Sequence, residues 1–412
     1  MKFPSYLSLH TFFVMAIWGL LNIQQVHAQA GIELENVQAL IRFGEQITFI
    51  ATIESASPLQ AVEIMISDVS SGMTQVEPIT LGPEGRTEYR FDTTQNPLRP
   101  FTNVTWKYQF TFPDGSTTQS QSFAVRYADD RFNWQTVETG SLRVHWYEEG
   151  TSFGQAALEA AQAGLESIRN LLPLDLAQPI EIFVYANVKD LGGTLMPGGA
   201  DWLAGHADPA LGIVMVVVEP GTEQNITMEQ RIPHELMHIM LYRRIGAGYD
   251  RIPVWLREGM ATLVELYPNP DYERVLAEAV AGNRLIPLRD LCTSFPADRG
   301  QAFLAYAESR SFTHYLHETY GLTGLLDLSA AYADGVDCER GTERVSGMPL
   351  SRLEAEWHSS LSGQNAFLPI LQNLSPYLVL LCLVLAIPLI GMATALRKKG
   401  NRNEPETFVR KR

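Results

Sequence analysis

Residues 233–261 read PHELMHIMLYRRIGAGYDRIPVWLREGMA, and the interpretation of the rest of the chain starts from this stretch. Its first part contains the pentad H-E-L-M-H at 234–238. Residues four apart lie on one face of a helix, so the imidazoles of His234 and His238 can reach one metal ion. Imidazole nitrogen suits Zn²⁺, and a catalytic zinc takes three protein ligands and leaves its fourth position for water. The pentad therefore predicts a metal-binding helix; the alternative is two surface histidines on an ordinary helix.

Two carboxylates of the same stretch complete the predicted site. Glu235 projects from the adjoining face of the helix, where it can accept a proton from a metal-bound water. Glu258 follows on a second predicted helix, after a glycine-containing loop at 246–248, and can complete a His₂Glu metal site. Gly259 and Ala261 are small, which predicts a close approach of the two helices. The alternative for Glu258 is a structural glutamate in a salt bridge.

Pro233 bears on where the first of these helices begins. A proline fits the first turn of a helix, whereas in the interior it removes a hydrogen bond. We therefore expect this helix to begin near Ile232.

The pentad, followed by W-L-x-E-G-x-A at 255–261, resembles the gluzincin branch of the MA clan of metallopeptidases, and in particular the bacterial peptidase MA-like domain family. The resemblance covers roughly residues 135–362. It implies an α+β zincin-like domain that cleaves peptide or protein substrates with one Zn²⁺ per chain. Metzincins have a third histidine soon after the pentad, but no histidine lies between His238 and His314 here, which argues against that branch.

The resemblance also implies a role for each site residue. His234, His238 and Glu258 are expected to be the metal ligands and Glu235 the catalytic base. Gluzincins commonly place a Tyr or His where it can donate to the oxyanion of the reaction. Tyr306 is the expected candidate for that role, with packing in a helical core as the alternative.

Residues 31–126 show a different pattern, with short runs of alternating apolar and polar residues between turn signals. The clearest runs are 47–53, 61–66 and 104–110, and P-D-G at 113–115 is a hairpin-type turn. Several short strands at this spacing predict an all-β sandwich of immunoglobulin-like type. No catalytic pattern occurs in it.

The pattern changes after residue 126. Strands are expected at 141–147, 180–185 and 213–218, and an amphipathic helix at about 153–172. The strand at 213–218 is a candidate edge that pairs with an extended substrate, with an ordinary strand as the alternative. Successive helices follow from Met228 onward, which fits an α+β domain.

Both ends of the chain carry apolar segments. Residues 1–30 resemble a cleaved signal peptide, with an uncleaved N-terminal anchor as the alternative. Residues 377–396 contain no charged residue over the length that a membrane-spanning helix needs, and the basic tail at 397–412 predicts a cytoplasmic C-terminus. A buried core helix is the alternative. We therefore expect a single-pass protein of the cell membrane whose bulk lies outside the cytoplasm.

Charge and cysteine content add two expectations. The net charge is −15, and the chain without its basic tail is more acidic still, which argues against nucleic acid as a partner. Cys382 falls in the apolar segment, so Cys292 and Cys338 remain as a candidate disulfide in an oxidising compartment, with two free thiols as the alternative.

The sequence thus favours a membrane-anchored zinc metallopeptidase that faces outward. The runner-up is a non-catalytic surface binding protein with a structural or degenerate metal site. Glu235 separates the two, because a structural metal site has no need of a base. A metal-dependent hydrolase that acts on something other than peptides is a third possibility. No feature of the sequence fixes the oligomeric state.

Overall fold

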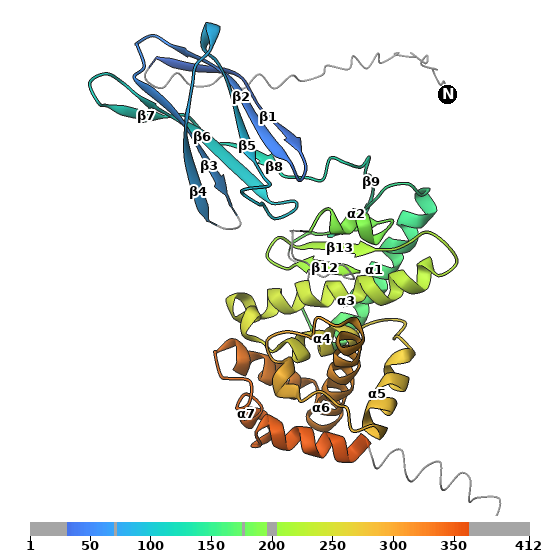
Figure 1. Ribbon diagram of the computed structural model, residues 1–412. Coiled ribbons are helices and arrows are strands. Elements are labelled where there is room, and N and C mark those ends of the chain that lie inside the picture. Colours follow the sequence, from blue (N-terminus) through green and yellow to red (C-terminus); the bar gives the residue numbers. More distant parts are fainter. Residues whose placement is uncertain (1–30, 70–71, 175–177, 196–203, 362–412) are drawn as a thin grey trace, which may run out of the picture. The chain divides into compact units, whose positions relative to one another are not determined.

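The computed structural model of the chain describes residues 31–69, 72–174, 178–195 and 204–361 (Figure 1). The chain divides into two compact units, Met1–Arg131 and Phe132–Arg412, each with its own hydrophobic core. The two units are described separately below.

Apart from a 3-10 turn at Pro83–Gly85, the described part of the N-terminal unit is all β. One antiparallel sheet has the strand order β1-β2-β5, and a second has the order β4-β3-β6-β7, with β8 also pairing with β6. Alternate residues of both sheets enter one shared core, in which the rings of Phe49 and Trp106 lie 5.0 Å apart. The strands expected at 47–53, 61–66 and 104–110 are confirmed. The strands are β1 (Ile32–Arg42), β2 (Gln46–Ser55), β3 (Ala61–Asp68), β4 (Met73–Ile79), β5 (Arg86–Asp92), β6 (Asn103–Thr111), β7 (Thr117–Gln119) and β8 (Phe123–Arg126).

The C-terminal unit begins with a mixed sheet of strand order β12-β13-β11-β10-β9. Strands β10, β11 and β13 are parallel, while β9 and β12 run antiparallel at the two edges. Alternate residues such as Val144, Ile182 and Val214 share a core with helices α1 and α3. The expected strands and the first helix are confirmed. These elements are β9 (Gln135–Thr139), β10 (Leu142–Trp146), α1 (Thr151–Leu171), β11 (Ile180–Tyr185), α2 (Val188–Gly192), β12 (Gly205–Asp208), β13 (Ile213–Val217) and α3 (Gln224–Ile245).

The edge position falls on a different strand from the one expected. The strand at 213–218 lies inside the sheet as β13, between β11 and β12. Beside β13, the edge strand among the described residues is β12, which is four residues long and was not expected from the sequence. A strand this short, with the sequence GHAD, has too little apolar alternation to be found from the sequence.

The rest of the unit is helical, with α6 as its longest element, and a helical stretch at 350–361 follows α7 (Figure 1). Helix α6 changes direction at Gly321, which has a φ of 69°. The Cys292–Cys338 disulfide is confirmed and joins the segment before α6 to the segment after it. The elements are α4 (Val254–Leu263), α5 (Asp271–Ala281), α6 (Arg299–Ala333) and α7 (Glu343–Ser346), with short 3-10 turns at Gly246–Arg251 and Leu288–Leu291.

The start expected for α3 was wrong. The helix begins at Gln224, two turns before Ile232, and contains Pro233 in its interior. The ring of Pro233 packs closely on α1. A Cβ atom added to Gly164 of α1 would lie 2.8 Å from Cγ of Pro233. Burial of the ring against Gly164 explains in part how the helix accommodates a proline.

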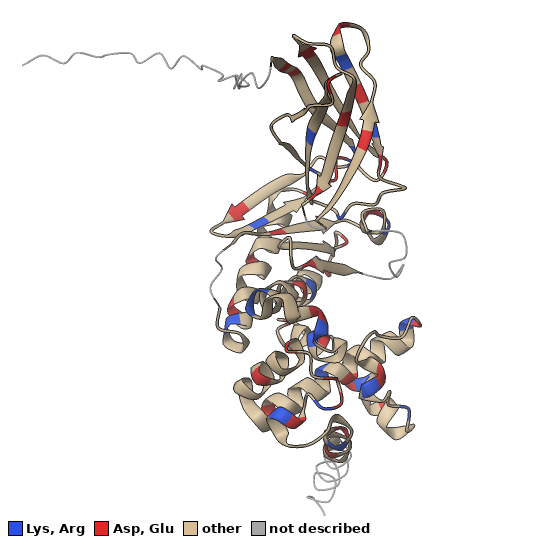
Figure 2. Cartoon of the chain, turned by 90° about the vertical axis from the view of Figure 1, so that its left-hand side faces the viewer, with Lys and Arg blue, Asp and Glu red and all other residues tan. Residues whose placement is uncertain are grey.

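The predicted segments at the two ends, 1–30 and 377–412, lie outside the described residues. Among the helices that the structure describes, none combines the length and apolar character needed to span a bilayer. Charged residues of both signs are interspersed along the strands and helices of both units (Figure 2).

Candidate metal centre and cleft

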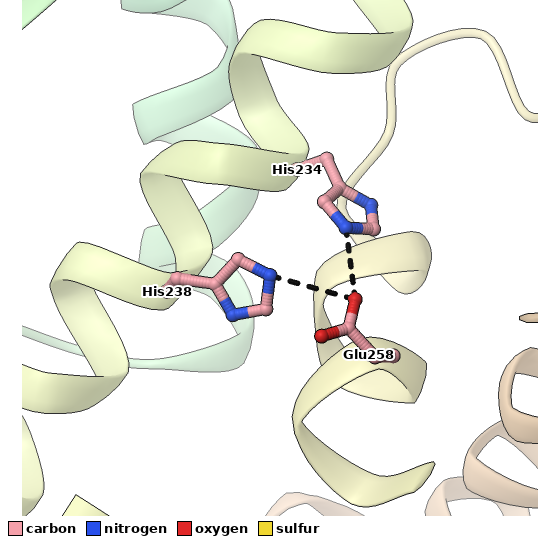
Figure 3. A group of neighbouring side chains, drawn as sticks. All are labelled: His234, His238 and Glu258. Atoms are coloured by element: carbon pink, nitrogen blue, oxygen red, sulfur yellow. Dashed lines mark hydrogen bonds and ion pairs between the residues drawn. The ribbon is translucent and has the colours of Figure 1, made fainter. Parts of the chain in front are cut away.

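Helices α3 and α4 bring the three expected ligands together. His234 and His238 project from one face of α3 towards Glu258 on α4 (Figure 3). The Nε2 atoms of the two histidines lie 3.2 Å and 3.6 Å from Oε2 of Glu258. One ligand atom from each residue lies within 4.8 Å of the others. The helical spacing of the histidines and the turn between α3 and α4 therefore create a three-residue cluster.

The donor set fits a zinc ion. Tetrahedral ligands about 2.0–2.1 Å from zinc lie roughly 3.3 Å from one another, close to the separations of both histidines from Glu258. Burial would raise the pKa of the Glu258 carboxyl, but the charge of His238 and the hydrogen bond to His234 hold it well below its ordinary value. The carboxyl is therefore ionised, as a metal ligand must be.

Both histidines are oriented through their second ring nitrogen. Nδ1 of His234 lies 3.1 Å from Oε1 of Glu265, and Nδ1 of His238 lies 3.0 Å from the hydroxyl of Tyr249. Such partners fix the ring so that Nε2 faces the metal, and a carboxylate partner also increases the basicity of the ligand. Sequence reasoning missed both residues. Helical spacing from Glu258 could not have found Glu265, because α4 ends at Leu263 and Glu265 lies in the chain that follows it.

Pro233 contributes to the placement of Glu265. Proline has no amide hydrogen, so the carbonyl of Glu229, four residues earlier, receives no helical hydrogen bond from it. That carbonyl accepts instead from the amide of Leu266 at 3.0 Å. The chain just after α4 is thereby tied to α3, and the neighbouring Glu265 is held against His234.

The small residue after Glu258 acts differently from expectation. A Cβ atom on Gly259 would lie 2.0 Å from Oγ1 of Thr313 and 2.5 Å from the carbonyl oxygen of Ser309, both on α6. Gly259 therefore allows α4 to approach α6, whereas the expectation was an approach to the histidine-bearing helix.

Glu235, the expected base, is 9% exposed and points to the edge strand of the sheet. A Cβ atom added to Gly205 of β12 would lie 2.4 Å from Oε1 of Glu235. The carboxylate of Glu235 thus lies directly against the backbone of the edge strand, beside the three-residue cluster.

A cleft of about 650 Å³ opens over this region. Tyr306, the expected oxyanion partner, lines it with its ring centroid 6.1 Å from that of His234, and packs edge-on against Phe295. Burial, together with the charges of Glu258 and Glu235, raises the pKa of Tyr306, so the phenol stays protonated. The lining residues are Ala204, Gly205, Gln230, Arg231, His234, Glu235, Glu265, Asn269, Tyr272, Val275, Arg299, Gly300, Phe303 and Tyr306.

The later histidines have no place in this cluster. His314 lies on the exposed side of α6, 3.9 Å from Glu318. The described metal-binding group consists of His234, His238 and Glu258.

The described part of the C-terminal unit is thus an α+β domain whose His₂Glu cluster lies beside a cleft. Residues 160–363 match the family model of the Peptidase MA superfamily, and this part of the chain is a Peptidase MA superfamily domain. The match agrees with the family resemblance found in the motifs.

Comparison with other proteins adds only weak likenesses. No curated protein matches the chain. An aminopeptidase N family protein from Idiomarina loihiensis is 8% identical over 78% of this chain and 69% of its own, with a TM-score of 0.30. A family 56 carbohydrate-binding module that binds β-1,3-glucan is 14% identical over 23% of this chain and 99% of its own, with a TM-score of 0.17. A cycloalternan-degrading enzyme from Trueperella pyogenes is 15% identical over 24% of this chain and 16% of its own, with a TM-score of 0.17. No conclusion about activity rests on these similarities.

Proposed function

We propose that the C-terminal unit is a zinc-dependent peptidase that hydrolyses peptide bonds with an activated water. The observation that carries the proposal is the position of Glu235, next to the His₂Glu cluster and open to the cleft. A metal site with a purely structural role has no use for a second carboxylate beside it. The binding-protein alternative therefore has less support.

The residues divide the work as follows. His234, His238 and Glu258 hold the metal, which when bound supplies Lewis acidity and lowers the pKa of water. Glu235 takes the proton of the attacking water and delivers it to the leaving amine. The Tyr306 phenol donates to the oxygen on which negative charge develops. The edge strand β12 aligns an extended substrate by main-chain hydrogen bonds.

The test compares the purified full-length chain in detergent with its Glu235→Gln variant, both loaded with zinc, on a mixed peptide library. Exchange of the exposed Glu166 for Gln is the matched control. We expect cleavage by the wild type and the control, loss of cleavage in Glu235→Gln, and equal zinc content in all three. Zinc binding without cleavage by any of them would favour the binding-protein alternative. Equal cleavage by wild type and Glu235→Gln would refute the mechanism.

We further propose that the chain is a single-pass membrane protein with this domain outside the cytoplasm. Support comes from the uncharged segment 377–396, the basic residues after it and the Cys292–Cys338 disulfide, since disulfides persist in oxidising compartments. Protease treatment of intact cells would digest the domain and spare a C-terminal tag. Protection of the domain would contradict the orientation.

For the N-terminal unit we propose the immunoglobulin-like type. The strand orders β1-β2-β5 and β4-β3-β6-β7 place sequence neighbours β2 and β3 in opposite sheets, as the Greek-key connections of such sandwiches do. An experimental structure of this unit, compared strand by strand with immunoglobulin-like domains, tests the assignment. A different order of strand pairing would contradict it.

A further inference from the structure

Two arginines line the cleft beside the metal centre. Arg231 lies on α3, one turn before His234, and Arg299 is the first residue of α6. The acidic residues of the same lining have other roles, Glu235 as the base and Glu265 as the partner of His234. Among the described residues, neither arginine forms an ion pair with a carboxylate. The cleft is therefore lined by two arginines that form no ion pair within the described part of the chain, although the chain has 46 acidic and 31 basic residues.

Arg231 is the better placed of the two. Its Nη1 donates to the carbonyl of Val217, at the end of β13, which leaves most of its five N–H groups without a partner among the described residues. Burial lowers the pKa of the guanidinium, opposed by the charges of Glu219 and Glu235. A charge kept partly out of water is costly unless a partner or ligand of opposite charge compensates it.

The hydrogen bond to Val217 fixes where the guanidinium lies. The amide of Val217 donates to the carbonyl of Ala204 at 2.8 Å. The carbonyl of Val217, which accepts from Arg231, therefore lies next to the start of the edge strand β12. Gly205, the next residue, touches Glu235. A peptide extended along β12 beside Glu235 would therefore also pass the Arg231 guanidinium.

We propose that the preferred substrate carries a carboxylate that Arg231 binds next to the scissile bond, while Arg299 adds a second positive charge to the same cleft. Carboxylates accept paired, charge-assisted hydrogen bonds from guanidinium, which give both affinity and orientation. The carboxylate belongs to an acidic side chain or to the free C-terminus of the peptide. This inference rests on the proposed peptidase function and names its substrate class.

The experiment measures kcat/KM of the zinc-loaded full-length protein on matched peptides. One series carries Glu, Gln or Lys at each position around the cleaved bond, and a second ends in a free acid or an amide. The first series reports an acidic side chain and the second a C-terminal carboxylate. The variants are Arg231→Gln, Arg231→Lys and Arg299→Gln, with Arg274→Gln as the matched control, since Arg274 is exposed and paired with Asp271 and Glu278.

We expect the wild type to prefer a carboxylate at one position by about tenfold or more, the size of a charge-assisted hydrogen bond. The preference should disappear in Arg231→Gln, persist in part in Arg231→Lys, weaken in Arg299→Gln and remain in Arg274→Gln. Cleavage of the neutral peptides should match the wild type in Arg274→Gln, and in the Arg231 and Arg299 variants it should fall less than cleavage of the acidic peptides.

Two results would overturn the inference while leaving the peptidase proposal intact. The first is that the wild type shows no preference for a carboxylate. The second is an equal loss of kcat/KM on all peptides in Arg231→Gln, which would mean that Arg231 only holds α3 against β13. If the wild type cleaves no peptide, the peptidase proposal fails by itself. Carboxylate recognition is then tested by the binding of fluorescently labelled versions of the same peptides to the Glu235→Gln variant. Tighter binding of the acidic peptides would support carboxylate recognition, and equal binding would refute it.

Discussion

The amide of Leu266 donates to the carbonyl oxygen of Glu229 at 3.0 Å, in the position that the residue at 233 would take in an uninterrupted helix. Pro233 makes this contact possible because it has no amide hydrogen. A proline that removes one hydrogen bond from α3 thus ties α3 to the chain that follows α4.

Pro233→Ala should therefore weaken the metal site more than the fold. The new amide competes with Leu266 for the carbonyl of Glu229, and Glu265 is held less firmly against His234. We expect the affinity for zinc to fall several-fold, measured by titration against a competing chelator. The melting temperature should change little, since the better helix former offsets the lost packing on Gly164. An unchanged zinc affinity would show that the Leu266 contact does not position the site.

Gly205→Ala should displace the base. The Cβ atom would lie 2.4 Å from Oε1 and 3.0 Å from Cδ of Glu235, and the end of that side chain can move more easily than the backbone of β12. Misplacement of a reacting group by about 1 Å costs on the order of 100-fold in rate, so we expect kcat to fall by roughly 10- to 100-fold. Zinc content and melting temperature should stay at wild-type values. Gly192→Ala is the control, because its Cβ atom would meet nothing within 4 Å. Full activity in Gly205→Ala would contradict this account of Glu235.

Glu265→Gln should reduce metal affinity without removing a ligand. Its Oε1 lies 3.1 Å from Nδ1 of His234, and loss of the negative charge makes that imidazole a weaker donor to the metal. Changes of this kind cost about 10- to 100-fold in affinity. Chelator competition measures the effect, with Glu166→Gln as the matched surface control. Equal zinc affinities of Glu265→Gln and Glu166→Gln would show that Glu265 does not support the metal site.

Glu308 should make stability depend on pH. Burial raises its pKa from 4.5 to about 8, although its carboxylate accepts the amide of Ile286 at 2.9 Å. Between about pH 4.5 and 8 the unfolded chain therefore releases a proton that the folded chain keeps, so stability falls as the pH rises through this window.

Chemical denaturation of the metal-free protein at pH 5, 6, 7 and 8 measures this slope. Glu308→Gln should flatten it and should be more stable than the wild type at pH 8, since glutamine still offers an oxygen to Ile286. Glu166→Gln should leave the slope unchanged. An identical slope in Glu308→Gln would mean that other groups set the pH dependence.

Much of the architecture follows from local patterns. The i, i+4 spacing of His234 and His238 defines a ligand pair on any helix, and period-two alternation located the main strands of both units. A carboxylate on the next helix completed the candidate ligand set because α3 and α4 are joined by a short turn and pack against each other. These features depend on residues close in the chain, where spacing alone determines geometry.

Long-range contacts decided the rest. The sequence contains nothing to indicate that β12 forms the edge, that Gly205 touches Glu235, or that Arg231 reaches Val217, because these pairs lie 14 to 30 residues apart and meet only when the sheet and α3 pack together. Gly259 packs on α6 rather than α3 for the same reason, since α6 begins 40 residues later. The sequence by itself determined the candidate metal ligands and the candidate base, whereas the tertiary structure decided what orients them and which charges line the cleft. The candidate ligands can be identified from their local spacing. The orientation of their side chains and the charges around them depend on contacts that form only after the chain has folded.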